Sequence, residues 1–305
     1  GLAESVQLLR SEVGNRHEIV GGSQAIRDVM ERIDRVAPTD ARVLITGDNG
    51  TGKELVARAL HHSSSRSEGP FIEVNCAAIP SELIESELFG HMKGSFTGAV
   101  ADHAGKFEQA QDGTLFLDEV GDMSLDAQAK VLRALEEGVV TRVGGSKAIT
   151  VDVRVFTATN KDLSKEIAEG RFREDLFYRL NVVPIVVPAL RDRREDVRPL
   201  VTYFVSQAVR SNHGPAKTIE DGAMARLEAL DWPGNVREVR NTVERLLILS
   251  PGETIRASDV DALVAGTASG DVLGTALLNL EGFSEFKENA EMAYIAHKLR
   301  TNDWN

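Results

Sequence analysis

Up to residue 188, short apolar runs alternate along the chain with stretches whose apolar residues recur at helical spacing. Each run but the last leads into such a helical pattern, which predicts a parallel sheet with helices on both of its faces. Pro184 interrupts the last run and favours an edge position, because proline cannot donate a hydrogen bond to a central ladder. The five predicted strands are Val43–Ile45, Phe71–Val74, Thr114–Leu117, Val151–Thr157 and Val182–Val187.

From Leu190 onward the pattern is purely helical, and helices are predicted at Val197–Val209, Ala223–Leu230 and Asn235–Leu249. Asn235 is expected to be the N-cap of the last of these, with Glu238 three residues on completing a variant of the capping box. The pattern therefore predicts an α/β domain followed by a smaller all-helical one.

The first predicted strand runs into a glycine-rich turn, Gly47-Asp48-Asn49-Gly50-Thr51-Gly52-Lys53, and an amphipathic pattern begins at Leu55. A strand, such a turn and a helix start are what a phosphate-binding loop requires. Glycines let backbone N–H groups converge on a polyphosphate, the helix N-terminus adds its positive end, and the lysine reaches the outer phosphates. A plain strand-to-helix turn with a surface lysine explains less of the pattern. Glu54 stands where the general motif has Ser or Thr, and its carboxylate is still an oxygen donor for a hard cation or its water shell.

Polar residues end two further strands. Asp118 and Glu119 follow one apolar run, and Thr159 and Asn160 follow the next strand. In parallel α/β sheets the carboxyl ends of the strands form the edge at which ligands bind. We therefore expect Asp118 to hold Mg²⁺ through its water shell and Glu119 to orient and polarise an attacking water. A solvated strand end is the other interpretation.

A glycine-flanked segment, residues 94–99 (Gly94-Ser95-Phe96-Thr97-Gly98-Ala99), interrupts the chain after a helix predicted at Ser81–Phe89 with Ser81 as its cap. A phenylalanine among glycines and polar residues is difficult to bury. Composition leaves two alternatives open: Phe96 folds back into the core, or it is an exposed apolar contact on a flexible arm.

Charge and cysteine content exclude several classes of function. The chain has 35 basic and 47 acidic residues and a net charge of −12, which argues against nonspecific nucleic-acid binding by this chain itself. The one cysteine, Cys76, excludes an internal disulfide and a Cys-rich zinc site, and its apolar neighbours predict a buried, inert thiol. No stretch has the length of a membrane span and no signal peptide is evident, so a cytoplasmic protein without membrane contact is expected.

The segment 94–99, taken with the phosphate loop, resembles the central domain of bacterial sigma-54-dependent activators, which are AAA+ ATPases also called enhancer-binding proteins. The resemblance covers about residues 18–266, and the motifs occur in the family's order. The family's loop usually has alanine where this chain has Ser95, whereas Phe96 and Thr97, the residues that the family uses to contact the sigma factor, are present. The habitual Glu of the family's phosphate loop matches Glu54.

The resemblance implies ATP and Mg²⁺ as ligands and assigns further roles by position. Asp118 and Glu119 match the Walker B pair, and Asn75 matches the residue that holds the catalytic glutamate in a switchable state. Thr159 and Asn160 match the first sensor. Arg237, which lies off the apolar stripe of its helix, matches the second sensor, and Ile19 and Val20 are also assigned to the nucleotide.

Arg173 and Arg179 match the family's arginine-finger segment, which acts on a neighbouring subunit. They are six residues apart, about 240° around a regular helix at 100° per residue. If the segment is a regular helix, both cannot point at one phosphate, so at most one is the finger and the other is structural. For either, an ordinary surface arginine is the alternative.

The family's organisation implies four segments. Residues 1–16 are expected to be a linker helix from a regulatory domain outside the chain, 17–188 the AAA+ α/β nucleotide-binding subdomain and 189–265 the helical lid. Residues 266–305 are expected to be a linker and the start of a helix-turn-helix DNA-binding domain, with a helix at about Phe283–Leu299. DNA would be bound only through that missing domain, and the chain is expected to be an excised fragment.

The implied function is an ATP-hydrolysing motor that remodels the sigma-54 RNA polymerase closed complex, as a hexamer or heptamer ring when active and a dimer at rest. One alternative is a nucleotide-dependent assembly or regulatory module without sigma-54 remodelling activity, and Ser95 is the only sequence feature that favours it. A remodeller of another client is a third hypothesis, which the sigma-contact motif disfavours. The regulon, the input signal and the ring size are not encoded in these residues.

Overall fold

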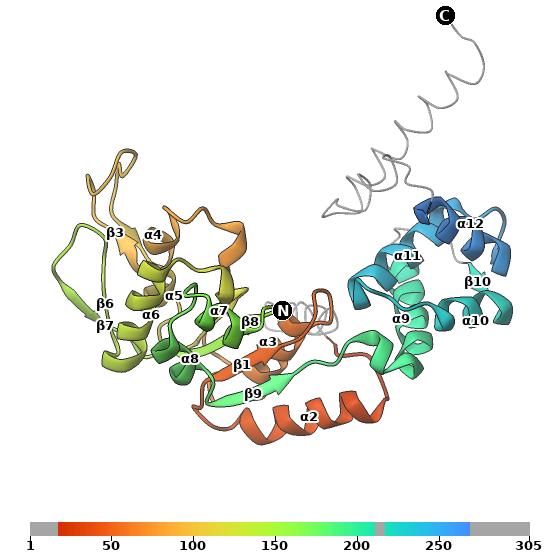
Figure 1. The fold of residues 1–305 in the computed structure, drawn as a ribbon, viewed down its shortest axis with the longest axis horizontal. Helices are drawn as coiled ribbons and strands as arrows, with labels where there is room; N and C mark the ends of the chain where they lie inside the picture. The colour runs from red at the N-terminus through yellow and green to blue at the C-terminus, as the bar shows by residue number, and fades with distance from the viewer. Residues whose placement is uncertain (1–17, 211–216, 269–305) are drawn as a thin grey trace, which may run out of the picture. The chain divides into compact units, whose positions relative to one another are not determined.

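The computed structural model describes residues 18–210 and 217–268, and the chain divides into two compact units, residues 1–189 and 190–305 (Figure 1). The predicted linker 1–16 and the helix predicted at Phe283–Leu299 lie outside the described residues. No helix in the described ranges is long and apolar enough to cross a membrane.

A five-stranded parallel sheet forms the centre of the first unit, with the strands in the spatial order β2-β5-β8-β1-β9. β9 is at one edge, as Pro184 predicted, and Thr46 of β1 pairs in register with Thr159 of β8. Because all five strands are parallel, their carboxyl ends meet at one edge. The strands are β1 (Val43–Thr46), β2 (Phe71–Asn75), β5 (Thr114–Asp118), β8 (Arg154–Thr159) and β9 (Val183–Val186).

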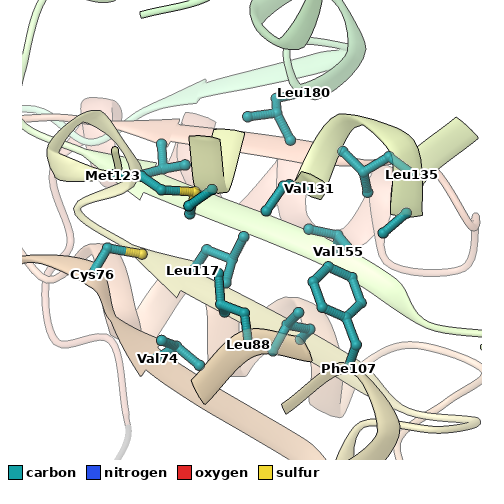
Figure 2. Close-up of a cluster of buried hydrophobic side chains, with 14 of the residues drawn as sticks. Val74, Cys76, Leu88, Phe107, Leu117, Met123, Val131, Leu135, Val155 and Leu180 are labelled. Atoms are coloured by element: carbon teal, nitrogen blue, oxygen red, sulfur yellow. The ribbon is translucent and has the colours of Figure 1, made fainter. Parts of the chain in front are cut away.

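Both faces of this sheet are buried, since successive side chains of one strand enter different clusters. Leu115 and Leu117 of β5 join a cluster with Leu88, Phe107 and other residues (Figure 2). Phe116, between them, joins the cluster on the opposite face with residues of α2 and α3. Helices on both faces were predicted, and this is confirmed. The helices of this unit are α2 (Gln24–Val36), α3 (Lys53–His62), α4 (Ile84–Phe89), α5 (Lys106–Gln109), α6 (Leu125–Glu137), α7 (Leu163–Ala168) and α8 (Glu174–Leu180).

Two antiparallel hairpins leave the sheet and lie side by side (Figure 1). The first joins β3 (Gly90–His91) to β4 (His103–Ala104) and carries residues 94–99, hereafter the contact loop. The second hairpin joins β6 (Val139–Thr141) to β7 (Ala148–Thr150). β-branched residues on both sides of Gly144 and Gly145 are the sequence signal for this hairpin.

The second unit is helical apart from a short parallel strand pair. Its elements among the described residues are α9 (Val197–Arg210), α10 (Asp221–Ala229), α11 (Asn235–Leu249), α12 (Ala257–Ala268), β10 (Thr218–Ile219) and β11 (Thr254–Ile255). The sequence pattern missed α12, which includes residues 266–268 of the predicted linker.

Three predicted boundaries are wrong. α4 begins at Ile84 and lacks a side-chain cap, because residues 81–83 form a turn in which the carbonyl of Pro80 accepts the N–H groups of Leu83 and Ile84. β8 begins at Arg154 and not at Val151. The N-cap of α11 is Gly234, whose N–H donates to Glu238, and Asn235 instead accepts the N–H of Leu190.

Candidate functional site

The phosphate loop connects β1 to α3 in the backbone conformation that its glycines permit. A Cβ on Gly47 would lie 2.6 Å from the carbonyl oxygen of Val187, and Gly52 precedes α3 with a φ of +101°. Both positions therefore require glycine. The Thr51 hydroxyl donates to the carbonyl of Asp48 at 2.8 Å, which stabilises the turn. The first amides of α3 lack intrahelical partners, so this end of the helix can bind an anion.

Lys53 is the first residue of α3, and its side chain is only 6% exposed. Its Nζ donates to the carbonyl of Gly47 at 3.1 Å and lies 3.4 Å from Oε1 of Glu119. The ammonium group thus lies between the loop and the strand-end acids. A phosphate in the loop would meet this charge without a large movement of the side chain.

Asp118 and Glu119 lie at the carboxyl end of β5, beside β2 and β8. Glu119 has a φ of +50°, and its Oε2 accepts the backbone N–H of Asn160 at 3.1 Å. Burial raises the pKa of the Asp118 carboxyl above its ordinary value, and the Glu119 carboxylate shifts this pKa in the same direction. Two acids this close favour a bound cation, because it would relieve their repulsion. Among the described residues, no cluster of three or more His, Cys, Asp or Glu side chains could itself hold a metal ion.

Asn75 and Thr159 end the two strands that flank β5. The Asn75 carboxamide oxygen accepts the N–H groups of Ala77 and Ala78, at 3.0 and 3.3 Å, and so caps the short 3-10 helix Cys76–Ala78. The Thr159 hydroxyl is fully buried and accepts the N–H of Lys161 at 3.1 Å. The switch role of Asn75 and the sensor role of Thr159 stay predictions.

Cys76 is 3% exposed, so the predicted buried thiol is confirmed. Burial is the main cause that raises its pKa to about 12, and the nearby charge of Asp118 adds to the effect. The thiol is therefore protonated at neutral pH and a poor nucleophile.

Glu54 takes part in a series of ion pairs that links α3 to β2. Its Oε1 accepts from Nε of Arg58 at 2.6 Å, and the same guanidinium reaches Glu73 of β2 at 2.7 Å. Burial and the charge of Glu54 raise the pKa of Glu73. In this arrangement Glu54 is held by Arg58, and a role toward the nucleotide stays a prediction.

The two candidate finger arginines differ in their surroundings. Arg173 is the N-cap of α8 and lies outside the helix, so the helical-wheel argument does not apply to it. Its guanidinium forms two hydrogen bonds with Asp175, at 3.0 and 2.7 Å. Arg179 is exposed in the last turn of α8 and has no ion pair with the residues that the structure describes. The charge of Arg179 contributes, after burial, to lowering the pKa of Arg42, so two cations lie near each other here.

The contact loop is exposed and held by few bonds. Within it, Gly94 N–H donates to Ala99 at 2.8 Å and Ala99 N–H donates to Phe96 at 3.0 Å. The Phe96 side chain is 38% exposed, and its ring meets the His91 ring edge-on with centroids 5.0 Å apart. Of the two alternatives for Phe96, the structure therefore supports the exposed contact and not burial in the core.

The second hairpin is fastened to the first hairpin through a backbone hydrogen bond and to α5 through side chains. The Met92 N–H donates to Val143 at 3.0 Å, and the Arg142 guanidinium forms two hydrogen bonds with Glu108 of α5, at 2.9 and 2.7 Å. This hydrogen bonding holds the pKa of Glu108 below its ordinary value. Ser95 packs against Gly144, where an added Cβ would lie 2.5 Å from the Ser95 Cβ.

Three further residues, Ile19, Val20 and Arg237, were also predicted to bind the nucleotide. Ile19 is partly buried against the cluster that includes residues of α2 and α3, and Val20 is also partly buried. Arg237 is exposed on α11 in the second unit. A role of these three residues in nucleotide binding stays a prediction.

Because the glycine loop, Lys53 and the two acids meet at one edge of a parallel sheet, the first unit has the arrangement of a P-loop NTPase. A family model described as the sigma-54 interaction domain matches residues 19–186, and one described as an AAA+ ATPase lid domain matches residues 191–273. The chain therefore belongs to the sigma-54 interaction domain family of AAA+ ATPases, and the predicted family and fold class are confirmed.

Similar proteins agree with this assignment. The DNA-binding transcriptional regulator NtrC of Azospirillum brasilense is 53% identical over 257 residues, which are 84% of this chain and 53% of NtrC. The regulatory protein AtoC of Escherichia coli is 46% identical over 268 residues, 85% of this chain and 58% of AtoC. The crystal structure of NtrX from Brucella abortus in complex with ATP matches with a TM-score of 0.78 and 42% identity, and the match covers 95% of this chain and 66% of NtrX. The chain thus spans about half the length of the first two of these relatives.

Proposed function

We propose that this chain is the ATP-hydrolysing motor of a sigma-54-dependent transcriptional activator and that it remodels the sigma-54 RNA polymerase closed complex. The observation that carries the proposal is the convergence of Lys53, Asp118 and Glu119 at one sheet edge, with Lys53 Nζ 3.4 Å from Glu119. The contact loop and the family assignment support sigma-54 as the partner.

The residues at this edge fit ATP and Mg²⁺. The loop amides and Lys53 would bind the phosphates, because the Gly47 position leaves no room for a side chain and the α3 N-terminus offers free N–H groups. Asp118, whose pKa burial raises, would hold Mg²⁺ through its water shell. When bound, the cation would supply neutralising charge on the phosphate oxygens.

Glu119 is the residue that we expect to orient and polarise the attacking water. It is held by the Asn160 N–H and by Lys53, and a nucleotide phosphate would compete for Lys53 and leave one carboxylate oxygen available. Glu119→Gln should lower ATP turnover by about 10²–10⁴-fold and keep ATP binding, since the amide cannot accept the proton. The exposed Glu136→Gln on α6 is the matched control. Unchanged turnover in Glu119→Gln would refute the assignment of Glu119.

An arginine from a neighbouring subunit would complete the site. Arg179 is better placed for this role than Arg173, because Arg173 is already bound to Asp175 within its own chain. Such a finger contributes on the order of 10³–10⁵ in rate, so the isolated chain should be nearly inactive and specific activity should rise steeply with protein concentration. A flat specific activity would refute the ring of six or seven subunits.

Phe96 and Thr97 are the residues that we expect to contact sigma-54. Phe96→Ala should abolish open-complex formation in a sigma-54-dependent assay and leave ATP turnover within about twofold, because the loop shares no hydrogen bond with the nucleotide site among the described residues. If the parent chain hydrolyses ATP without forming open complexes, it would be a nucleotide-dependent module without sigma-54 remodelling activity.

A further inference from the structure

The Ser95 side chain lies in an unusual environment for a serine. Its hydroxyl oxygen is buried and has no hydrogen-bond partner among the described residues. The side chain faces Gly144 of the second hairpin, so close that a Cβ on Gly144 would lie 2.5 Å from the Ser95 Cβ. A buried hydroxyl without a partner raises the free energy of the state that buries it.

Few other contacts fasten the contact loop to the rest of the unit. The Met92 N–H to Val143 hydrogen bond, at 3.0 Å, crosses between the two hairpins near their base. The Phe96 ring packs edge-on against His91, and most of the remaining loop residues are exposed. The Ser95–Gly144 contact thus joins the tip of the loop to the second hairpin.

We propose that the Ser95–Gly144 contact is a latch between the contact loop and the second hairpin, and that the unpaired Ser95 hydroxyl weakens it. The latch sets the population of a released loop, in which Ser95 reaches water and Phe96 leaves His91. The link from release to client binding rests on the proposed function, whereas the latch itself does not.

The physical reason lies in the difference between the two states. In the docked state the hydroxyl has lost its water and gained no partner, and in the released state it regains water. An alanine at this position would bury the same Cβ without that loss, so it would favour docking. Ser95 therefore acts as a positioning residue. A substitution of Ser95 can strengthen the docked state, and a substitution of Gly144 can weaken it.

Amide hydrogen exchange of the nucleotide-free chain tests the latch, with the Met92 amide as the reporter because it donates from one hairpin to the other. Ser95→Ala should slow this exchange by about tenfold, as expected for removing an unsatisfied buried hydroxyl. Gly144→Ala should accelerate it by at least about tenfold, because the new methyl group overlaps Ser95 and alanine is strained at the φ of +75°.

Gly252→Ala is the matched control. Gly252 has a φ of +74° and nothing within 4 Å of an added Cβ, so the variant has the same backbone strain without the overlap. It should leave the Met92 exchange unchanged. If Ser95→Ala leaves the exchange unchanged or accelerates it, the latch is overturned, and this holds even if Gly144→Ala does not fold.

Binding of purified sigma-54 to the same variants separates the two proposals. We expect Ser95→Ala to weaken binding and Gly144→Ala to strengthen it, each in proportion to its change in exchange. Opposite shifts in exchange without sigma-54 binding by any variant would support the latch and count against sigma-54 as the client.

Discussion

The nucleotide edge of the sheet, formed by residues 47–53 with Asp118, Glu119, Thr159 and Asn160, differs from the contact loop in how it is held. At the nucleotide edge, the polar groups follow directly from paired strands, and Lys53 and the Asn160 N–H both bind Glu119. The contact loop is largely exposed, and the Phe96 ring meets the His91 ring edge-on.

The difference fits the two tasks of the proposed function, which are phosphate chemistry and contact with a client protein. Chemistry on a phosphate requires charged groups that are already in position before the reaction begins. A buried parallel sheet holds such groups rigidly at its edge. Contact with a client that must itself be moved requires a segment that can change position, and a segment with few bonds has a low free energy of local opening. The proposed motor would thus combine a firmly held nucleotide edge with a loosely held contact loop.

The largest expected effect tests whether the nucleotide edge is complete within one chain. Arg179→Ala should lower turnover of the assembled protein by about 10³–10⁵-fold, because the charge that develops on the transferring phosphoryl group loses its stabilising cation. Arg173→Ala should have a smaller effect, since Arg173 is paired with Asp175. Steady-state ATPase rates at saturating protein concentration measure both.

Mixing two inactive variants supplies the control. A chain with Lys53→Ala lacks the nucleotide contact and keeps Arg179, so mixed with an Arg179→Ala chain it should restore part of the turnover. No recovery at any mixing ratio would place Arg179 in its own chain's site or outside catalysis.

The next largest effect tests whether the nucleotide edge and the contact loop are independent of each other in the nucleotide-free chain. Lys53→Ala should lower ATP turnover by about 10²–10³-fold, as for loss of one electrostatic contact to the reacting group. Met92 amide exchange in the nucleotide-free chain should not change, because the Lys53 ammonium makes its hydrogen bond with Gly47 and its ion pair with Glu119, and neither residue belongs to a hairpin. Lys165→Ala, an exposed lysine on α7, is the control. Faster Met92 exchange in Lys53→Ala would show that the regions are coupled before any nucleotide binds.

The smallest effect concerns the sheet beneath the nucleotide edge. His61 of α3 is buried, its Nδ1 lies 2.9 Å from the Thr114 hydroxyl oxygen, and burial is the main cause that lowers its pKa. At His61 the unfolded chain therefore takes up a proton near pH 6.5 before the folded chain does, so the His61 contribution to stability is constant above that pH and falls below it. Thermal unfolding should show a midpoint about 2–4 °C lower at pH 5.5 than at pH 7, equivalent to about 1 kcal/mol.

The His61 effect has a neighbouring control. His61→Gln should remove this part of the pH dependence. His62→Gln, at the exposed neighbouring position, should keep most of it, because burial lowers the His61 pKa more than the His62 charge does. An equal slope in both variants would show that other groups cause the acid sensitivity.

Local sequence determined much of this protein. Apolar runs with helical segments between them specify a buried parallel sheet, Pro184 marks its edge, and the glycine spacing before Lys53 requires a phosphate-type loop. These features follow from short-range sterics and periodicity, so they could be predicted residue by residue. The acids at the end of β5 could be predicted for the same reason, since strand polarity places them.

Only the tertiary structure decided how distant segments meet. That Arg173 pairs with Asp175 while Arg179 is exposed depends on where α8 begins, and that Asn235 binds Leu190 instead of capping α11 depends on a neighbouring turn. The Ser95–Gly144 contact joins two hairpins that are far apart in sequence, and no local pattern specifies it. Strand positions and turn type follow from local preferences, but the partner of a side chain follows from which segments the whole fold brings together.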